Sequence, residues 1–283
     1  MARKLQEFLE EDIGLGDITT NAVVPEETHV RAEIVVKEDA VIAGIMEAKV
    51  LLQIAGLDFV FHVEDGEEVS SGKVIAEVKG NGRTVLSIER TLLNIMSRMS
   101  GIATITRRLV KMLQEDGLNV RIAATRKTAP GLRYFDKRAV MIGGGDPHRF
   151  RLDDAFLIKD NHIAVAGSIS EAMMRLRKNA MFSKKIEVEV KTSEQAVEAA
   201  KLGADIIMID NMTIEDARKT TQTLVNLGLR DKVLIEISGG INENNLLEYA
   251  RLGPDIISLG YITHSVKSVD LSLEIVEVMP GKK

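Results

Sequence analysis

Basic side chains are concentrated between residues 123 and 162, where they could bind an anion. Arg126 and Lys159 each come directly after a short apolar run of the kind that forms a β-strand. Loops that follow strands commonly carry binding sites, and the planar guanidinium group matches carboxylates and phosphates. These positions therefore predict an anion site, with a solvated basic loop as the alternative. The basic residues of the site are expected to come from Arg126, Lys127, Arg133, His148, Arg149 and Lys159.

A second set of charged side chains is acidic and alternates with apolar residues in strand-like runs. In the run 186–190 the alternation puts Glu187 and Glu189 opposite the aliphatic residues, and Lys191 follows on the same face. Asp210 ends the next such run. Ionised carboxylates inside a barrel are costly unless they are paired, hydrated or bound to a metal. We therefore predict that Glu189 and Asp210 hold Mg²⁺, through water or a bound diphosphate; a hydrated salt-bridge network is the alternative.

Glycines follow the last two strand-like runs of the chain. Ser238, Gly239 and Gly240 lie between one run and a helix that is expected to begin near Asn242, and Gly260 directly follows the next run. Exposed backbone N–H groups at the start of a helix bind phosphate, and phosphate sites in α/β barrels commonly use the last two strand loops. The two glycine-bearing loops predict a phosphate site, although glycine also serves any tight turn.

The overall composition limits the classes of partner. The chain has 283 residues, of which 45% are apolar, and this is sufficient for one large or two ordinary hydrophobic cores. Its net charge of −5 disfavours nucleic acid and anionic membranes as partners, so any bound anion must be attracted by a local cluster. The absence of Cys excludes disulfides and thiolate chemistry. The first residues have no apolar signal core and no run is long enough to span a membrane, so we expect a cytoplasmic protein.

The order of elements after residue 114 determines where these motifs lie. Strand-like runs alternate with helical patterns, which predicts a parallel sheet with crossover helices. An open doubly wound sheet is the alternative, but no G-x-G-x-x-G motif follows the first strand, and the polar ends of successive strands favour a closed barrel. In the fifth run, Glu236 and Ser238 share one face. The predicted strands are 120–124, 155–158, 186–190, 205–209, 233–237 and 255–259, and the predicted helices include 193–202, 213–227 and 242–252.

The first part of the sequence has a different pattern. Between residues 30 and 82, period-two alternation with Gly and Asp turns predicts a small α+β sandwich. A long helical pattern, apolar on more than one face, follows from 86 to 113. Arg90 lies near its start, and its position alone favours an exposed surface residue. The predicted segments are an N-terminal α+β sandwich with its linking helix (1–113), an α/β barrel with the active site (114–268) and a C-terminal segment (269–283) able to return to the N-terminal domain.

Three motifs make the chain resemble a known family. They are T-R-K-T-A-P-G-L-R (125–133), G-G-G-D-P-H-R (143–149) and I-K-D-N-H (158–162), in this order. With these motifs the chain resembles the quinolinate phosphoribosyltransferases, also called carboxylating nicotinate-nucleotide pyrophosphorylases, over nearly its whole length. The resemblance implies an incomplete, seven-stranded barrel with an N-terminal α+β sandwich. It also implies transfer of the phosphoribosyl group of phosphoribosyl pyrophosphate to quinolinate with decarboxylation, which yields nicotinate mononucleotide, pyrophosphate and carbon dioxide in NAD biosynthesis.

The resemblance also implies roles for the matching residues, with Mg²⁺ as cofactor. The E-R-T-L-L-N segment at 89–94 is similar to the family segment whose arginine is donated across a homodimer interface, and dimers can assemble further. The implied catalytic residues are Lys127, Lys159, Glu189 and Asp210. The implied quinolinate ligands are Arg90 from the partner, Arg126, His148, Arg149 and Lys159. The implied ligands of phosphoribosyl pyrophosphate are Lys127, Glu189, Asp210, Ser238, Gly239, Gly240 and Gly260, with Glu189 and Asp210 holding the metal.

Three other functions are compatible with parts of this pattern. A phosphoribosyltransferase of the same fold could act on nicotinate or another aromatic acid and release no carbon dioxide. A barrel enzyme could form a Schiff base through Lys159, although the excess of arginines disfavours it. A phosphosugar-binding module would bind phosphoribosyl pyrophosphate without turnover. The acidic D-D-x-x-T-T-G loop of the other large phosphoribosyltransferase class is missing, since Asp153 and Asp154 run directly into a strand.

Overall fold

The computed structural model describes residues 1–179 and 181–279, which form two compact units. Unit 1 comprises Met1–Arg107, Arg138–Gly144 and the segment from Val266, and unit 2 comprises Arg108–Lys137 and Gly145–Ser265. Residues 280–283 of the predicted C-terminal segment lie outside the described residues.

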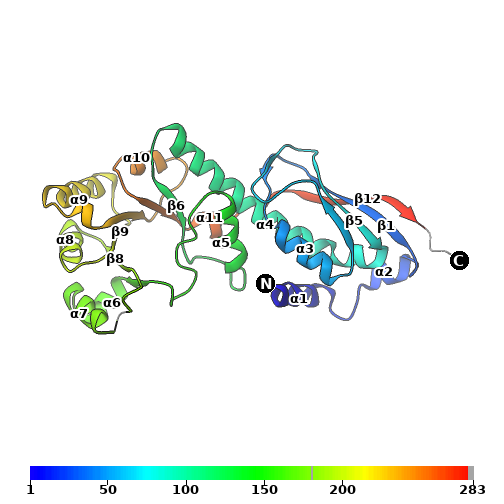
Figure 1. Cartoon of the computed structure of the whole chain (residues 1–283), viewed down its shortest axis with the longest axis horizontal. Coiled ribbons are helices and arrows are strands. Elements are labelled where there is room, and N and C mark those ends of the chain that lie inside the picture. Colours follow the sequence, from blue (N-terminus) through cyan, green and yellow to red (C-terminus); the bar gives the residue numbers. More distant parts are fainter. Residues whose placement is uncertain (180, 280–283) are drawn as a thin grey trace. The chain divides into compact units, whose positions relative to one another are not determined.

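Unit 1 is built on an antiparallel sheet in the order β12-β1-β5-β3. In β1 the buried residues Val30, Ala32 and Ile34 alternate with the half-buried Arg31 and Glu33, as the period-two pattern predicts. Figure 1 shows β12, from the end of the chain, beside β1 from its beginning. The sheet strands are β1 (His29–Val36), β3 (Asp58–Phe61), β5 (Val74–Asn81) and β12 (Leu271–Met279), and the other elements are α1 (Ala2–Ile13), α2 (Ile18–Val23), α3 (Ile45–Ile54) and the short pair β2 (Ala40–Val41) and β4 (Glu68–Val69).

Helix α4 (Gly82–Glu115) is the long helix that the sequence predicts between 86 and 113, and its chain runs from unit 1 into unit 2. Met96, Met99 and Ile102 are completely buried. Gly101 allows the segment that leads to β12 to pack directly on this helix, because a Cβ atom there would lie 2.2 Å from the carbonyl oxygen of Lys267. Any larger residue at 101 would push that segment away.

Unit 2 contains a parallel sheet in the order β6-β11-β10-β9-β8-β7, which confirms the α/β barrel-like prediction. The sheet has six strands among the described residues, whereas the resemblance implies seven. An isolated parallel bridge between Ala123 and Asp146 lies beside β6, where a seventh strand would pair. The six strands are β6 (Arg121–Ala124), β7 (Phe156–Ile158), β8 (Ile186–Val190), β9 (Ile206–Asp210), β10 (Leu234–Ser238) and β11 (Ile256–Leu259).

The helices of unit 2 follow the strands, and most lie near their predicted positions. Helices α8 and α9 begin at threonine caps, because Thr192 and Thr213 accept backbone N–H groups of the first turn. Besides part of α5 (Arg133–Ile142), which continues into unit 1, the helices are α6 (Asp160–Ala166), α7 (Ile169–Asn179), α8 (Ser193–Lys201), α9 (Ile214–Asn226), the 3₁₀ turn η1 (Arg230–Lys232), α10 (Leu246–Ala250) and α11 (Tyr261–His264).

The prediction of a helix from 242 to 252 was wrong at its beginning. The structure has a turn after Gly240, and α10 starts only at Leu246. Side-chain amides in the turn bond to nearby backbone: the Asn245 carbonyl accepts the N–H of Asn242 at 2.8 Å, and the Asn242 carbonyl accepts that of Asn244 at 2.9 Å. Such local bonds compete with helix formation.

Among the described residues, no helix is both long and apolar enough to cross a membrane.

Candidate functional site

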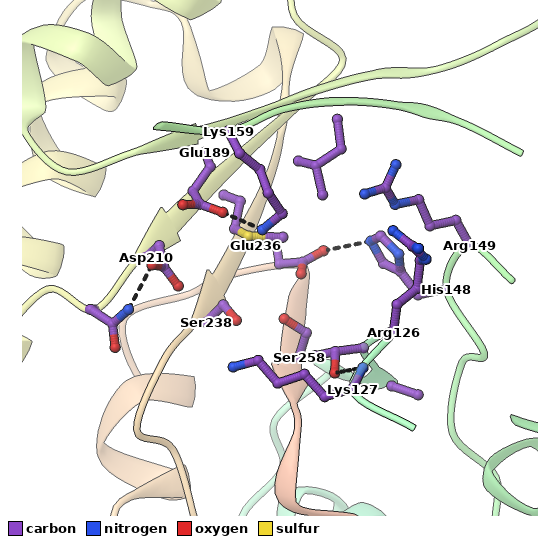
Figure 2. Close-up of a pocket in the computed structure, with 15 residues that line it drawn as sticks. Arg126, Lys127, His148, Arg149, Lys159, Glu189, Asp210, Glu236, Ser238 and Ser258 are labelled. Carbon is purple, nitrogen blue, oxygen red and sulfur yellow. Dashed lines mark hydrogen bonds and ion pairs between the residues drawn. The ribbon is translucent and has the colours of Figure 1, made fainter. Parts of the chain in front are cut away.

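A cavity of about 360 Å³ lies at the carboxyl ends of the parallel strands of unit 2 (Figure 2). It contains most of the side chains that the sequence singles out, although they come from loops up to 112 positions apart (126 to 238). The strand ends gather these residues because parallel strands end at the same edge of the sheet. The predicted residues that line it are Arg126, Lys127, His148, Arg149, Lys159, Glu189, Asp210 and Ser238.

A second cavity of about 300 Å³ adjoins the first. The two share Thr125, Lys127, Ser238 and Ser258 in their walls, so they form one continuous site. The predicted glycines Gly239, Gly240 and Gly260 line only the second cavity, together with His264.

Two of these glycines allow close approach of neighbouring groups. Gly239 has a φ of +94°, and a Cβ atom there would lie 2.7 Å from the backbone nitrogen of Asn211. At Gly260, a Cβ atom would lie 3.0 Å from Cδ of Lys127 and 3.1 Å from the ring of His264. The glycines therefore leave the space in which Lys127 and the backbone of the second cavity can contact a ligand.

Arg126 and Arg149 form the cationic wall of the first cavity. Burial lowers the pKa of Arg149, and the nearby charge of Arg126 lowers it further. Arg149 donates to the carbonyl oxygen of Ala155 at 3.3 Å. Nε of Arg126 is buried and has no hydrogen-bond partner among the described residues. Two guanidinium groups that repel each other, one with an unused donor, are well suited to a ligand with carboxylate groups.

His148 lies between this wall and two buried carboxylates. Its Nε2 atom is 3.3 Å from Glu187 Oε2 and 3.3 Å from Glu236 Oε2. Burial by itself lowers the pKa of His148, but the bonds to Glu187 and Glu236 outweigh it and raise the pKa to about 10. This shift favours the imidazolium form of His148 at neutral pH. Its backbone φ of 51° is in the left-handed region, which is uncommon for a residue other than glycine and typical of functional sites.

Sequence reasoning put Glu187 and Glu236 on the inner face of the sheet but gave them no role. The sequence pattern that pointed to them is a charged residue within an aliphatic strand. This pattern does not show that His148 is their partner.

Lys137 is a further residue that sequence reasoning missed. Its side chain is completely buried, and its Nζ atom donates to the carbonyl oxygen of Pro147, next to His148. Burial lowers the pKa of Lys137 to about 8, and the charge of Arg133 contributes. Arg133 itself does not line either cavity and donates instead to Thr128 and to the carbonyl oxygen of Phe150, both at 3.3 Å. Both basic side chains therefore brace the loops that carry the cationic wall.

The opposite wall is acidic. Glu189 lies near the end of β8, and its Oε2 atom accepts a hydrogen bond from Nζ of Lys159 at 2.5 Å. Asp210 ends the neighbouring strand β9 and accepts the side-chain amide of Asn211 at 2.6 Å. Two hard oxygen donors at adjacent strand ends, facing a cavity with room for a phosphorylated ligand, fit Mg²⁺ held through water or diphosphate.

Among the ligands that the family resemblance implies, Arg90 is the one that does not line these cavities. It belongs to unit 1, on α4, and its side chain is 64% exposed, with Glu89 at 3.8 Å as its ion-pair partner. Its predicted role requires a second copy of the chain.

Comparisons with known proteins extend over both units. Residues 17–100 match the model of the quinolinate phosphoribosyl transferase N-terminal domain, and residues 102–274 match that of the C-terminal domain. The chain is 46% identical to a probable carboxylating nicotinate-nucleotide pyrophosphorylase of Methanothermobacter thermautotrophicus, over 96% of this chain and 97% of the relative. It is 47% identical to the protein of the same name from Methanocaldococcus jannaschii, over 96% of each chain.

A solved structure shares the fold at similar length. The crystal structure of NadC from Streptococcus pyogenes superimposes with a TM-score of 0.89 at 36% identity, over 98% of this chain and 95% of that chain. With matches to both domain models and to full-length relatives, the chain belongs to the quinolinate phosphoribosyl transferase family.

Proposed function

We propose that this chain transfers the phosphoribosyl group of phosphoribosyl pyrophosphate to quinolinate and releases carbon dioxide, as a step of NAD biosynthesis. Relatives over nearly the whole length are named carboxylating nicotinate-nucleotide pyrophosphorylases. The observation that carries the proposal is the division of one site into a cationic wall and an acidic wall. The first suits the two carboxylates of quinolinate, and the second suits a metal-bound diphosphate.

The cationic wall orients quinolinate. Arg126, His148 and Arg149 bind its carboxylates, with Lys159 beside them, so that the pyridine nitrogen faces the phosphoribosyl group. This nitrogen needs no general base because it carries no proton at neutral pH. It attacks the anomeric carbon while the bond to pyrophosphate breaks, and Lys127 neutralises charge on the departing pyrophosphate.

Carbon dioxide leaves after the transfer. Once the ring nitrogen is bonded to the sugar it is positively charged, and it stabilises the electron pair left on the adjacent carbon when the carbon–carboxylate bond breaks. A proton then takes the place of the carboxylate. Gly239, Gly240 and Gly260 provide the open backbone against which the phosphate of the sugar can lie.

Glu189 and Asp210 are the residues proposed to hold Mg²⁺. The metal supplies charge neutralisation at the diphosphate. Because Glu189 is paired with Lys159, binding of quinolinate by Lys159 would free that carboxylate for the metal, and the two substrates would be linked through this pair.

Release of labelled carbon dioxide tests the proposed reaction. Quinolinate labelled at the 2-carboxylate is expected to yield labelled carbon dioxide only when phosphoribosyl pyrophosphate and Mg²⁺ are both present, because decarboxylation requires the quaternary nitrogen. Nicotinate in place of quinolinate serves as control and should yield no nucleotide. Formation of nucleotide from nicotinate without carbon dioxide release would instead favour the non-decarboxylating transferase.

We further propose a cytoplasmic homodimer in which the partner's Arg90 completes each site. Arg90 is exposed and does not line the cavities of its own chain, and the family resemblance assigns it to the neighbouring site. Mixing inactive Arg90→Ala and Lys159→Ala proteins is expected to restore activity, because each hybrid dimer has one site with both residues. Random exchange should recover about one quarter of the wild-type rate. Mass spectrometry verifies that subunits have exchanged. If activity is still not recovered after exchange, a shared site is contradicted.

A further inference from the structure

The two carboxylates beside His148 are among the most deeply buried charged groups of the protein. Glu187 on β8 is 1% exposed and Glu236 on β10 is 0% exposed. Their ligand atoms and that of His148 lie within 4.8 Å of one another. Apart from the ion pair between Glu236 Oε2 and His148 Nε2, Oε1 of Glu187 and both oxygens of Glu236 have no partner in the described part of the chain. Two buried carboxylates this close are unfavourable unless a cation lies between them.

The imidazole ring of His148 lies where such a cation would be needed. Its Nε2 atom faces both carboxylates, as Figure 2 shows for Glu236, while its Nδ1 atom has no hydrogen-bond partner among the residues that the structure describes. The ring itself lines the cavity. The Nε2 atom is thus held by the two carboxylates, and the Nδ1 atom is available to a ligand.

We infer that Glu187 and Glu236 are positioning residues that keep His148 doubly protonated, so that its second N–H can donate to a carboxylate of the substrate. This inference rests on the proposed function and adds two residues to its site. An N–H of an imidazolium forms a charge-assisted bond to a carboxylate, which is roughly twice as strong as a neutral one.

The other charges around the cavity explain why two carboxylates are needed. Arg126 follows β6, Arg149 is the residue directly after His148, and Lys159 follows β7; all three are positively charged and disfavour a further cation. Asp210, the last residue of β9, is the remaining acid of this cavity besides Glu189 and Glu236, and it bonds to Asn211. Burial lowers the pKa of His148, and Glu187 and Glu236 offset it and raise the pKa to about 10.

Nitrogen-15 NMR of the histidine rings tests the protonation state directly, in the wild-type, full-length protein. The chain has five histidines, and a His148→Gln variant assigns the resonance. Both ring nitrogens of His148 are expected to remain protonated at pH 8.5, where an ordinary histidine is neutral. A ring that loses its proton between pH 6 and 7 would overturn the inference. This readout does not depend on turnover, so it remains decisive even if quinolinate is not the substrate.

Substrate kinetics then test the role of the carboxylates. In a Glu187→Gln/Glu236→Gln double variant, the KM for quinolinate is expected to rise by about 10-fold or more between pH 6 and 8.5, because His148 becomes neutral and a charged hydrogen bond is lost. The wild-type KM should stay constant over this range, the KM for phosphoribosyl pyrophosphate should not change, and each single variant should be intermediate.

The matched control is Ile237→Val, a conservative change at a buried position next to Glu236. It is expected to keep the wild-type pH profile. If the double variant also keeps the wild-type profile, the carboxylates have only a structural role. If purified wild-type protein binds one equivalent of Zn²⁺ that the double variant does not bind, the cluster holds a metal in place of the proton, and the inference fails.

Discussion

Replacement of Arg126 by alanine is expected to lower kcat/KM for quinolinate by about 30- to 5000-fold, which corresponds to roughly 2–5 kcal/mol for loss of one partner of a buried charge pair. The expected loss is large because Arg126 has a buried Nε with no bond among the described residues, so its bonds are available to the ligand. The loss of kcat/KM should be selective for quinolinate, because Arg126 lines the first cavity and not the second cavity, which contains the glycines.

Steady-state kinetics with each substrate varied in turn measure this effect. Arg151→Ala is the matched control, because Arg151 lies two residues beyond Arg149, its side chain is 72% exposed, and it forms an ion pair with Asp153. It should retain wild-type kcat/KM. An Arg126→Ala enzyme with unchanged turnover of quinolinate would show that the cationic wall binds something else.

Removal of the metal is expected to abolish turnover. The Asp210→Asn variant should need about 10- to 100-fold more Mg²⁺ for half-maximal rate, which is the usual cost of losing a group that orients a metal through another ligand. The physical reason is that Asp210 is one of two acidic side chains proposed to hold the metal at the end of adjacent strands, and asparagine has a similar shape without the charge.

Initial rates over a series of Mg²⁺ concentrations, at fixed saturating quinolinate, measure this dependence. Asp231→Asn changes an exposed aspartate of η1 that lies outside both cavities, and it should not shift the curve. If Asp210→Asn lowers the rate equally at every Mg²⁺ concentration, Asp210 acts on the substrate and not on the metal.

Strand positions could be predicted well from the sequence because each strand of unit 2 is a short aliphatic run between turn residues. The alternation in β8 also placed Glu187 and Glu189 on the inner face correctly. It could not show that Glu187 and Glu236 share one histidine, because that depends on which strands are neighbours and on how far the loop with His148 reaches.

Other features were beyond sequence reasoning for different reasons. Lys137 has the spacing of an ordinary basic residue on a helix, and only the loop that folds over it makes it a buried donor. The helix expected from Asn242 begins later because asparagine side chains take over its first hydrogen bonds. Arg90 requires a second chain, which no pattern within one sequence supplies.

The pairing of β12 with β1 has a consequence for synthesis of the protein. Strand β1 ends at Val36 and β12 begins at Leu271, so the sheet of unit 1 lacks its edge strand, and β1 stays unpaired on that side, until 235 further residues (271 minus 36) have been added. At a translation rate of about 5–20 residues per second, the nascent chain waits roughly 10–50 s for that strand. The last residue of unit 2, Ser265, is therefore synthesised before the strand that completes the sheet of unit 1.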